Sequence, residues 1–470
     1  MESNLNRICR GFLVFCLPPL LFLSSCDLPK KAQAVYDFPE IVEKDTLTVL
    51  TLNTSISYFI YRDQSMGFHY DMIKDFCDRH GLMPKIKTAV NSNALVDMLL
   101  KGDGDLIAYD VPIENTLKDS LIYCGLTQVS RQVLVQRNTK RDTLIKDVPE
   151  LIGKEVYVKA HTKYDQRLKN LNRELGGGIV IRDVEKDTIV DEDLIRMVSS
   201  GKIRYTVADE YIAKINRTYF GNIDISLPLS FDQRSSWAVR KDMPVLADSL
   251  NAWFAQENIT PNYRRISKRY FEEAKGFSVS PKQSYLTFLK AGQLSPYDEQ
   301  FKKAGEEFGI DWRLLASISF FESTFNPDGE AWTGAGGLMG LMPATAESLG
   351  LGRDEMFDPA KNIRAGAKYM RKLLQSFSAV ENDDDRIKMV LASYNAGIGH
   401  IFDARALAKK YNADENVWAD NVEKYLELKR VERYYDDPVC RCGYFRAEET
   451  LNYVGSVMRC WAAYKEVVGF

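Results

Sequence analysis

The chain lacks several features that would reveal a function at once. Its 62 lysine and arginine residues nearly balance its 65 aspartate and glutamate residues, and the formal charge of -3 argues against a nucleic-acid partner. Only four histidines are present, and none lies at metal-ligand spacing from a cysteine. The glycine-rich stretch 334–340 follows no strand and precedes no lysine, which excludes a P-loop. The sequence therefore indicates no metal and no cofactor.

Long apolar runs are also missing. The stretch "GFLVFCLPPLLFL" (11–23) contains two prolines and is too short to cross a bilayer as a mature helix. Two arginines precede it, as in a signal peptide, which we predict for residues 1–25. The letters "LSSC" that follow resemble a bacterial lipobox, and this resemblance implies a lipid on Cys26 that holds the chain on a membrane. Residues 26–45 then form the lipidated cysteine and a tether; a plain secretory signal is the alternative.

Few cysteines are left after this leader. Of the eight in the chain, five follow Cys26, and an odd number leaves at least one free thiol. We expect Cys77 and Cys124 to be single buried residues. Two of the remaining three, Cys440, Cys442 and Cys460, could form one disulfide in an oxidising compartment.

The organisation of the chain changes after about residue 271. Across residues 46–271, short β-branched runs alternate with helical patterns in two similar sets, which predicts an α/β domain of two lobes with a hinged cleft. The periodicity then fades over residues 272–296, which we interpret as a linker. Strand signals almost vanish in residues 297–470, so a mainly α-helical domain is predicted there.

The first domain resembles a known family. The stretches "GFHYDMIKDFCDRHGL", "LLKGDGDLIAYD" and "WAVRKDMPVLADSLNAWF" resemble, in order and spacing, the family 3 extracellular solute-binding domains. The resemblance implies a small peptide or amino-acid-like ligand between the lobes, with Tyr58 and Asp209 at two ligand positions. The family's "T-x-E-R" arginine is missing from "PIENTLKDS". Arg131 is the candidate substitute, although a lobe-edge charge for Arg131 and a core aromatic for Tyr58 are the alternatives.

A single glutamate attracts attention in the second domain. Asp311 is a helix N-cap before the apolar stripe of "DWRLLASISFFE", so Glu322 lies at the end of the helix. The negative helix C-terminus and nearby phenylalanines (320, 321 and 325) would both raise the pKa of its carboxyl group. A carboxylic acid that stays protonated near neutral pH can serve as a general acid. The alternative is an ordinary solvated acid at a helix end.

The surrounding motifs favour the catalytic interpretation. "ESTFNPDGEAWTGAGGLMGLMPATAESLGL", "SYNAG" and "ETLNYVGSVM" resemble, in order, the SLT-type lytic transglycosylases, which have a lysozyme-like fold. A solute-binding domain placed before them resembles one membrane-bound branch of that family. The resemblance implies peptidoglycan as substrate, Glu322 as the single acid/base, and five residues of the sugar cleft: Tyr394, Asn395, Tyr453, Met339 and Met342. A helix cap for "YNAG" and a core aromatic for Tyr453 are the alternatives.

Two departures from the family weaken the expected sugar contacts. Ala331 and Gly340 stand where many relatives have serine and glutamine. We therefore keep three hypotheses: a lytic transglycosylase that closes a 1,6-anhydromuramyl ring, a hydrolase that releases reducing ends, and a lipoprotein that only binds glycan. In the first, the solute-binding domain regulates the enzyme, and the chain is anchored in the outer membrane facing the periplasm. Tyr58, Arg131 and Asp209 would hold the regulatory ligand.

Overall fold

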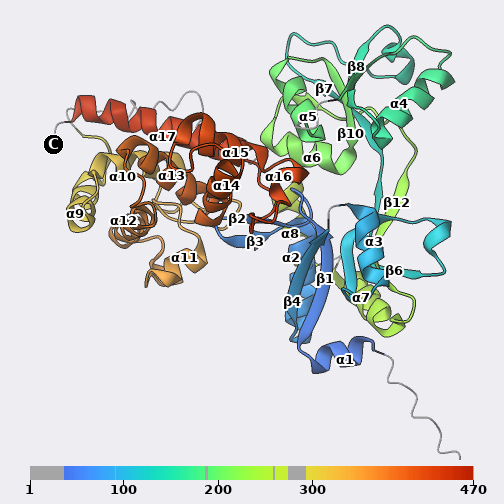
Figure 1. Cartoon of the computed structure of the whole chain (residues 1–470), viewed down its shortest axis with the longest axis horizontal. Helices are drawn as coiled ribbons and strands as arrows, with labels where there is room; N and C mark the ends of the chain where they lie inside the picture. The colour runs from blue at the N-terminus through green and yellow to red at the C-terminus, as the bar shows by residue number, and fades with distance from the viewer. Residues whose placement is uncertain (1–35, 90, 186–188, 258–259, 274–292, 469–470) are drawn as a thin grey trace, which may run out of the picture. The chain divides into compact units, whose positions relative to one another are not determined.

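The computed structural model describes residues 36–89, 91–185, 189–257, 260–273 and 293–468 (Figure 1). The predicted signal peptide, Cys26 and most of the predicted linker lie outside the described residues. From Asp37 onward the chain forms a single unit. Within the described part, no helix is both long and apolar enough to cross a membrane.

The first lobe is built on a five-stranded sheet of order β4-β1-β5-β12-β6. Strand β1 pairs in parallel with β4 and β5, whereas β12 pairs antiparallel with β5 and β6. The strands are β1 (Thr46–Leu52), β4 (Met83–Ala89), β5 (Leu106–Pro112), β6 (Leu121–Ser130) and β12 (Gln233–Arg240). The helices are α1 (Phe38–Glu43), α2 (Phe68–His80), α3 (Ser92–Leu100), α7 (Pro244–Glu257) and α8 (Pro261–Phe271). Helix α2 ends at Gly81, whose φ of 67° gives the left-handed cap that glycine favours.

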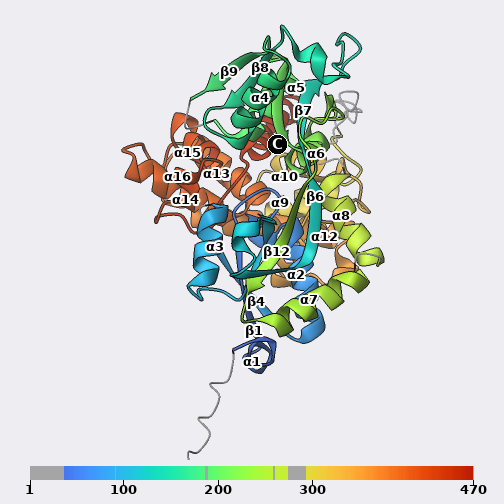
Figure 2. The same ribbon diagram turned by 90° about the vertical axis from the view of Figure 1, so that its right-hand side faces the viewer.

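The second lobe has a sheet of order β11-β7-β10-β8-β9. Its strands are β7 (Gln132–Arg137), β8 (Glu155–Lys159), β9 (Val180–Val184), β10 (Tyr205–Asp209) and β11 (Ile223–Asp224). Its helices are α4 (Lys163–Glu174), α5 (Asp191–Ser200) and α6 (Glu210–Tyr219). The chain passes between the lobes from β6 to β7 and again from β11 to β12 (Figure 2). These two passages are bonded to each other: the Gln132 carbonyl accepts from the Leu229 amide at 2.8 Å.

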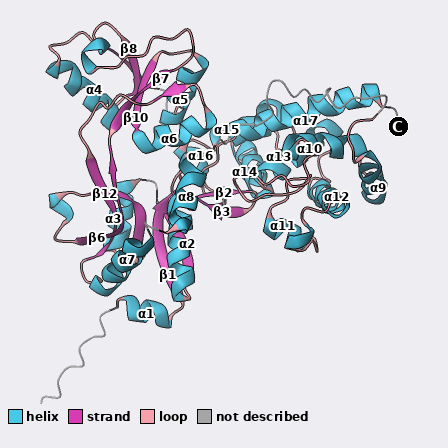
Figure 3. Ribbon diagram, turned by 180° about the vertical axis from the view of Figure 1, so that it is seen from behind, coloured by secondary structure: helices cyan, strands magenta, loops and turns pink. Residues whose placement is uncertain are grey.

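Helices make up most of the second domain (Figure 3). They are α9 (Asp298–Phe308), α10 (Trp312–Ser323), α11 (Pro343–Ser348), α12 (Pro359–Ser376), α13 (Asp383–Ala396), α14 (Ile398–Lys410), α15 (Glu423–Leu428), α16 (Glu432–Tyr435) and α17 (Glu448–Val467). Helix α10 lies against α9 and α17, and α13 also contacts α17. A continuous apolar core joins these helices. The predicted order, a two-lobed α/β fold followed by a mainly α-helical domain, is confirmed.

Three local features differ from the expectations. The predicted tether already folds at its end: Asp37 caps α1 and also accepts from the Val245 and Leu246 amides at the start of α7. The five described cysteines are free thiols; Cys460 is fully buried on α17, and the Cys440 thiol donates to the Tyr434 carbonyl instead. Most importantly, residues 59–66 form a short hairpin, β2 (Phe59–Tyr61) and β3 (Gln64–Met66), that was not predicted.

Candidate active site

Glu322 lies in the last turn of α10, as predicted. Asp311 caps the start of this helix by accepting from the Arg313 amide, and Thr324 ends it in a left-handed conformation with φ of 53°. The side chain of Glu322 is only 7% exposed. The rings of Phe321 and Phe325 meet the buried ring of Phe320 edge to face. The last turn of the helix therefore carries one nearly buried carboxyl group.

The glycine-rich loop passes very close to this carboxyl group. The loop is fixed to α10 because the Ser319 and Ser323 hydroxyls both donate to the Leu338 carbonyl at 2.9 Å. Gly340 has φ of 57°, and a β-carbon there would lie 2.3 Å from Glu322 Oε2. Any larger residue would collide with the carboxylate in its present position. The departure at Gly340 thus has a structural consequence: it leaves room for the carboxylate to lie against the loop.

The structure brings both predicted tyrosines to Glu322. The Tyr394 hydroxyl donates to the Met339 carbonyl at 2.7 Å. Burial, and then the charge of Glu322, raise the pKa of Tyr394 and of Tyr453 well above the usual value. Both hydroxyls therefore stay protonated, and the Tyr394 proton is held by the Met339 carbonyl.

Three other predicted sugar-binding side chains are engaged within the protein. The Asn395 amide oxygen accepts from the Thr450 hydroxyl at 2.6 Å, so this side chain holds α13 to α17. Met339 is completely buried against Gly366, and Met342 is buried at the start of α11. The backbone carbonyl groups of Met339 and Gly340 accept hydrogen bonds from Tyr394 and Arg62, whereas the side chains of Met339 and Met342 are buried.

An arginine from the first domain occupies the site. Arg62, at the tip of the β2–β3 hairpin, donates from Nη2 to both Glu322 carboxylate oxygens at 2.9 and 3.1 Å. Its Nη1 donates to the Gly340 carbonyl at 2.6 Å, and its Nε donates to the Asn395 carbonyl at 3.1 Å. The Arg62 amide also donates to the Ala396 carbonyl at 2.8 Å. Each of the three side-chain nitrogens of Arg62 therefore donates a hydrogen bond to the second domain.

Sequence reasoning missed this residue because its turn carries no familiar signal. Tight hairpins usually have glycine or asparagine where φ is positive, but here Arg62 and Asp63 adopt φ of 49° and 59°. Non-glycine residues in that region are strained and occur where the surroundings hold them. Arg62 and Asp63 both bond to the second domain, so this strained turn is held by the contact between the two domains.

A buried charge cluster supports the base of the hairpin. His400 Nε2 bonds to the Ile60 carbonyl at 2.7 Å, and His400 Nδ1 accepts from the Lys429 ammonium at 2.9 Å. Lys429, fully buried, also donates to Asp403 at 2.5 Å. Burial, and then the charge of Lys429, lower the pKa of His400, so its ring is neutral. The cluster of His400, Asp403 and Cys442 could suggest a metal site, but the lysine ammonium already supplies the positive charge.

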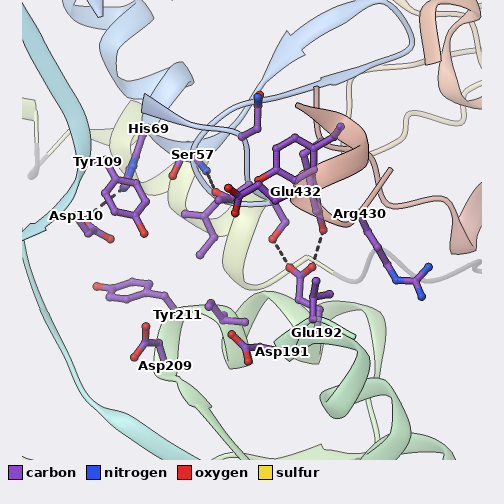
Figure 4. Close-up of a pocket in the computed structure, with 18 of the residues that line it drawn as sticks. Ser57, His69, Tyr109, Asp110, Asp191, Glu192, Asp209, Tyr211, Arg430 and Glu432 are labelled. Carbon is purple, nitrogen blue, oxygen red and sulfur yellow. Dashed lines mark hydrogen bonds and ion pairs between the residues drawn. The ribbon is translucent and has the colours of Figure 1, made fainter. Parts of the chain in front are cut away.

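A second cavity lies between the two lobes, with a volume of about 800 Å³ (Figure 4). Asp209 lines it and forms an ion pair with Lys163. The structure does not bring Tyr58 or Arg131 to this cavity: the Tyr58 hydroxyl bonds to Ser65, and Arg131 pairs with Glu210. Of the three predicted ligand residues, only Asp209 faces the space between the lobes.

The fold and the site together define a modular protein, in which a solute-binding module is joined to a lysozyme-like module whose cleft contains one buried glutamate. The family model of the transglycosylase SLT domain matches residues 299–417, and that of bacterial extracellular solute-binding proteins, family 3, matches residues 47–273. A Desulfosudis oleivorans protein named membrane-bound lytic murein transglycosylase F is 32% identical over 91% of this chain and 91% of its own length. The chain belongs to the membrane-bound lytic murein transglycosylase F family.

Other proteins are also similar to this chain. A Vibrio campbellii protein of the same name is 28% identical and covers 99% of this chain and 87% of its own length. Among solved structures, a Bacillus subtilis protein is 18% identical, with a TM-score of 0.43, over 52% of this chain and 98% of its own. ArgBP from T. maritima is 22% identical, with a TM-score of 0.39, over 50% of this chain and 99% of its own.

Proposed function

We propose that this protein is a lytic transglycosylase that cleaves the β-1,4 bond between N-acetylmuramic acid and N-acetylglucosamine in peptidoglycan. The observation that carries the proposal is the nearly buried Glu322 carboxyl group beside Tyr394 and Tyr453. Membership of the family supports the same reaction class. Glu322 acts as the catalytic residue, and Tyr394 and Tyr453 line the sugar cleft beside it.

One carboxyl group has to serve twice in this reaction. Most glycosidases use a pair of carboxyl groups, whereas the nearest acids in sequence, Asp328 and Glu330, are exposed on the turn after α10. Protonated Glu322 gives its proton to the glycosidic oxygen, and that bond to the muramyl C1 breaks. The Glu322 carboxylate then takes the proton of the muramyl 6-hydroxyl, whose oxygen bonds to C1. The product is a 1,6-anhydro ring, and no water is consumed.

Product mass tests this assignment. Purified peptidoglycan is digested with the wild type, with Glu322→Gln and with Glu330→Gln, the last as a matched control on the exposed turn. We expect anhydromuropeptides from the wild type and the control, and none from Glu322→Gln. Products heavier by one water would indicate a hydrolase, and the absence of products from the wild type under activating conditions would indicate a binding protein.

The second part of the proposal is that the solute-binding domain regulates the enzyme through Arg62. In the structure, the guanidinium group occupies the position from which Glu322 would reach a glycosidic oxygen. The conformation with the hairpin docked is therefore the inactive state.

Contacts at the base of the hairpin connect this inactive state to the cavity between the lobes. Residues 53–57 line the cavity and continue directly into β2. Glu192, from α5 of the second lobe, accepts from the Ser55 hydroxyl at 2.7 Å and from the Tyr444 hydroxyl of the catalytic domain at 2.6 Å. A change in the angle between the lobes would strain this bridge, and with it the docked hairpin.

A pelleting assay tests whether the hairpin blocks the cleft. Insoluble peptidoglycan is mixed briefly on ice with the wild type, with Arg62→Ala and with Arg182→Ala, whose arginine pairs with the exposed Glu155. We expect Arg62→Ala to sediment with the glycan more than the other two proteins. Equal sedimentation of all three would contradict a blocked cleft.

We also propose that a lipid on Cys26 holds the protein at the outer membrane, facing the periplasm. The "LSSC" letters after the apolar run support this anchor, as does the substrate, which lies in the envelope. The test is incorporation of radioactive palmitate into the wild type but not into Cys26→Ala, followed by fractionation of the two membranes. Label in both proteins, or a protein confined to the inner membrane, would contradict the proposal.

A further inference from the structure

Three parts of the chain line the cavity between the lobes. Both lobes contribute to its lining, and the catalytic domain adds a third wall, segment 430–438, which includes α16. Arg430 of this segment pairs with Asp193 at the start of α5 at 3.0 Å. The volume of about 800 Å³ lies in the range of sites for drug-sized ligands. A molecule that fills this cavity would therefore touch the catalytic domain directly.

Several polar groups facing the cavity make no hydrogen bond within the described part of the chain. The hydroxyl of Ser57, a residue that is 1% exposed, has no hydrogen bond, and neither do Asp110 Oδ1 and Asp191 Oδ1. Ser57, Asp110 and Asp191 are drawn in Figure 4 among the residues around the open space. Buried polar groups in native proteins are normally bonded, so a group without a partner needs an explanation. Three such groups line the same cavity, which points to a ligand that bonds to them.

The charge of these groups indicates what kind of ligand. His69 lies 3.5 Å from Asp110, but burial lowers the pKa of His69, so the ring does not supply a full positive charge. Lys159 and Lys163 also line the cavity, but Lys163 is paired with Asp209. Burial outweighs the nearby lysines and raises the pKa of Asp110 and of Asp191, so neither carboxylate is fully compensated by the protein. An ammonium group would supply the missing charge and the missing donors.

We propose that the cavity binds a ligand carrying ammonium groups, held by Asp110, Asp191 and the Ser57 hydroxyl and enclosed by segment 430–438. The inference rests on the proposed regulation of the enzyme and adds the ligand class to it. Closure around the ligand changes the wall made by segment 430–438, and so the catalytic domain senses the ligand without an intermediary.

The first experiment measures binding to the full-length wild type without peptidoglycan. The probes are 1,5-diaminopentane and the dipeptide Lys-Lys, with their fully N-acetylated forms and glutarate as matched controls. We expect only the free amines to raise the melting temperature and to give heat in calorimetry. Binding of glutarate or of the acetylated forms in place of the amines, or no binding by either amine, would overturn the proposal.

The second experiment uses variants. Asp110→Asn and Asp191→Asn should each weaken amine binding about tenfold or more, and each should raise the melting temperature of the ligand-free protein, because an unpaired buried carboxylate is removed. Tyr435→Ala in segment 430–438 should weaken binding as well. The control is Asp183→Asn, whose carboxylate is partly exposed beside Lys169. Unchanged binding together with a lower melting temperature would assign the aspartates a structural role.

These outcomes are independent of the test of regulation. Sedimentation of Arg62→Ala with peptidoglycan needs no ligand, and amine binding needs no activity. Amine binding with no effect of Arg62→Ala would contradict the proposed regulation alone, and the reverse result would contradict the ligand class alone.

Discussion

Replacing Arg62 with alanine should activate the enzyme in the absence of ligand. The side chains of Arg62 and Glu322 are 10% and 7% exposed and are joined by two hydrogen bonds, with two more from Arg62 to backbone carbonyls. Breaking such a buried pair costs about 3–5 kcal/mol. At about 3 kcal/mol, the equilibrium between docked and undocked hairpin shifts roughly 150-fold toward the undocked form. Ligand-free activity should rise by up to this factor.

The assay is the initial rate at which anhydromuropeptides are released from purified peptidoglycan. Arg62→Lys is the informative companion, because lysine retains the charge but loses the planar fork that reaches Glu322 and Gly340 together. We expect a smaller rise than for alanine. A rate equal to or below that of the wild type for Arg62→Ala, in a protein with an unchanged melting temperature, would refute the reasoning and make Arg62 a contributor to catalysis.

Three further predictions concern stability and pH. Lys429→Met should lower the free energy of unfolding by about 3–5 kcal/mol in urea, because Asp403 is left buried without its cation. Lys361→Met, at the exposed Lys361–Glu355 pair, should change it by at most about 1 kcal/mol. Gly340→Ala should disrupt the Glu322–Arg62 pair and raise ligand-free activity; an unchanged rate would contradict the predicted collision. Burial raises the pKa of Asp191 to about 6, in the presence of charges from Lys159, Glu192, Asp209 and Lys163. Since the ionised form binds the amine, calorimetry should show full affinity for 1,5-diaminopentane above pH 7 and a loss of about tenfold per pH unit below pH 6; affinity independent of pH would exclude Asp191 as the partner.

Local signals explain why much of the fold could be predicted. The N-cap at Asp311, the glycine after α2 and the alternation of strands with helices are short-range patterns, and each one appears where it was expected. The motif order also predicted that Tyr394 and Tyr453 belong to the same site as Glu322, and the charge of Glu322 acts on both tyrosines. The positions of these residues follow from patterns that extend over one helical turn, one strand or one family motif.

Long-range pairing explains what could not be predicted. Arg62 and Glu322 are 260 residues apart, and nothing in the letters "YRDQ" marks a partner in the other domain. The same holds for segment 430–438, whose place in the wall of the cavity depends on how the domains pack. The motif gave no sign that the Met339 side chain is buried in the core, because a motif does not distinguish a backbone contact from a side-chain contact.

The position of Arg62 in the same polypeptide as Glu322 has a consequence for how the enzyme can be controlled. A covalently linked inhibitor has a fixed effective concentration, which for short flexible links is on the order of millimolar. Dilution cannot release it, and making more enzyme cannot exhaust it. The fraction of active molecules is therefore independent of how much protein the cell makes. Each copy responds only to the event in its own cavity, so total activity rises in proportion to occupied cavities.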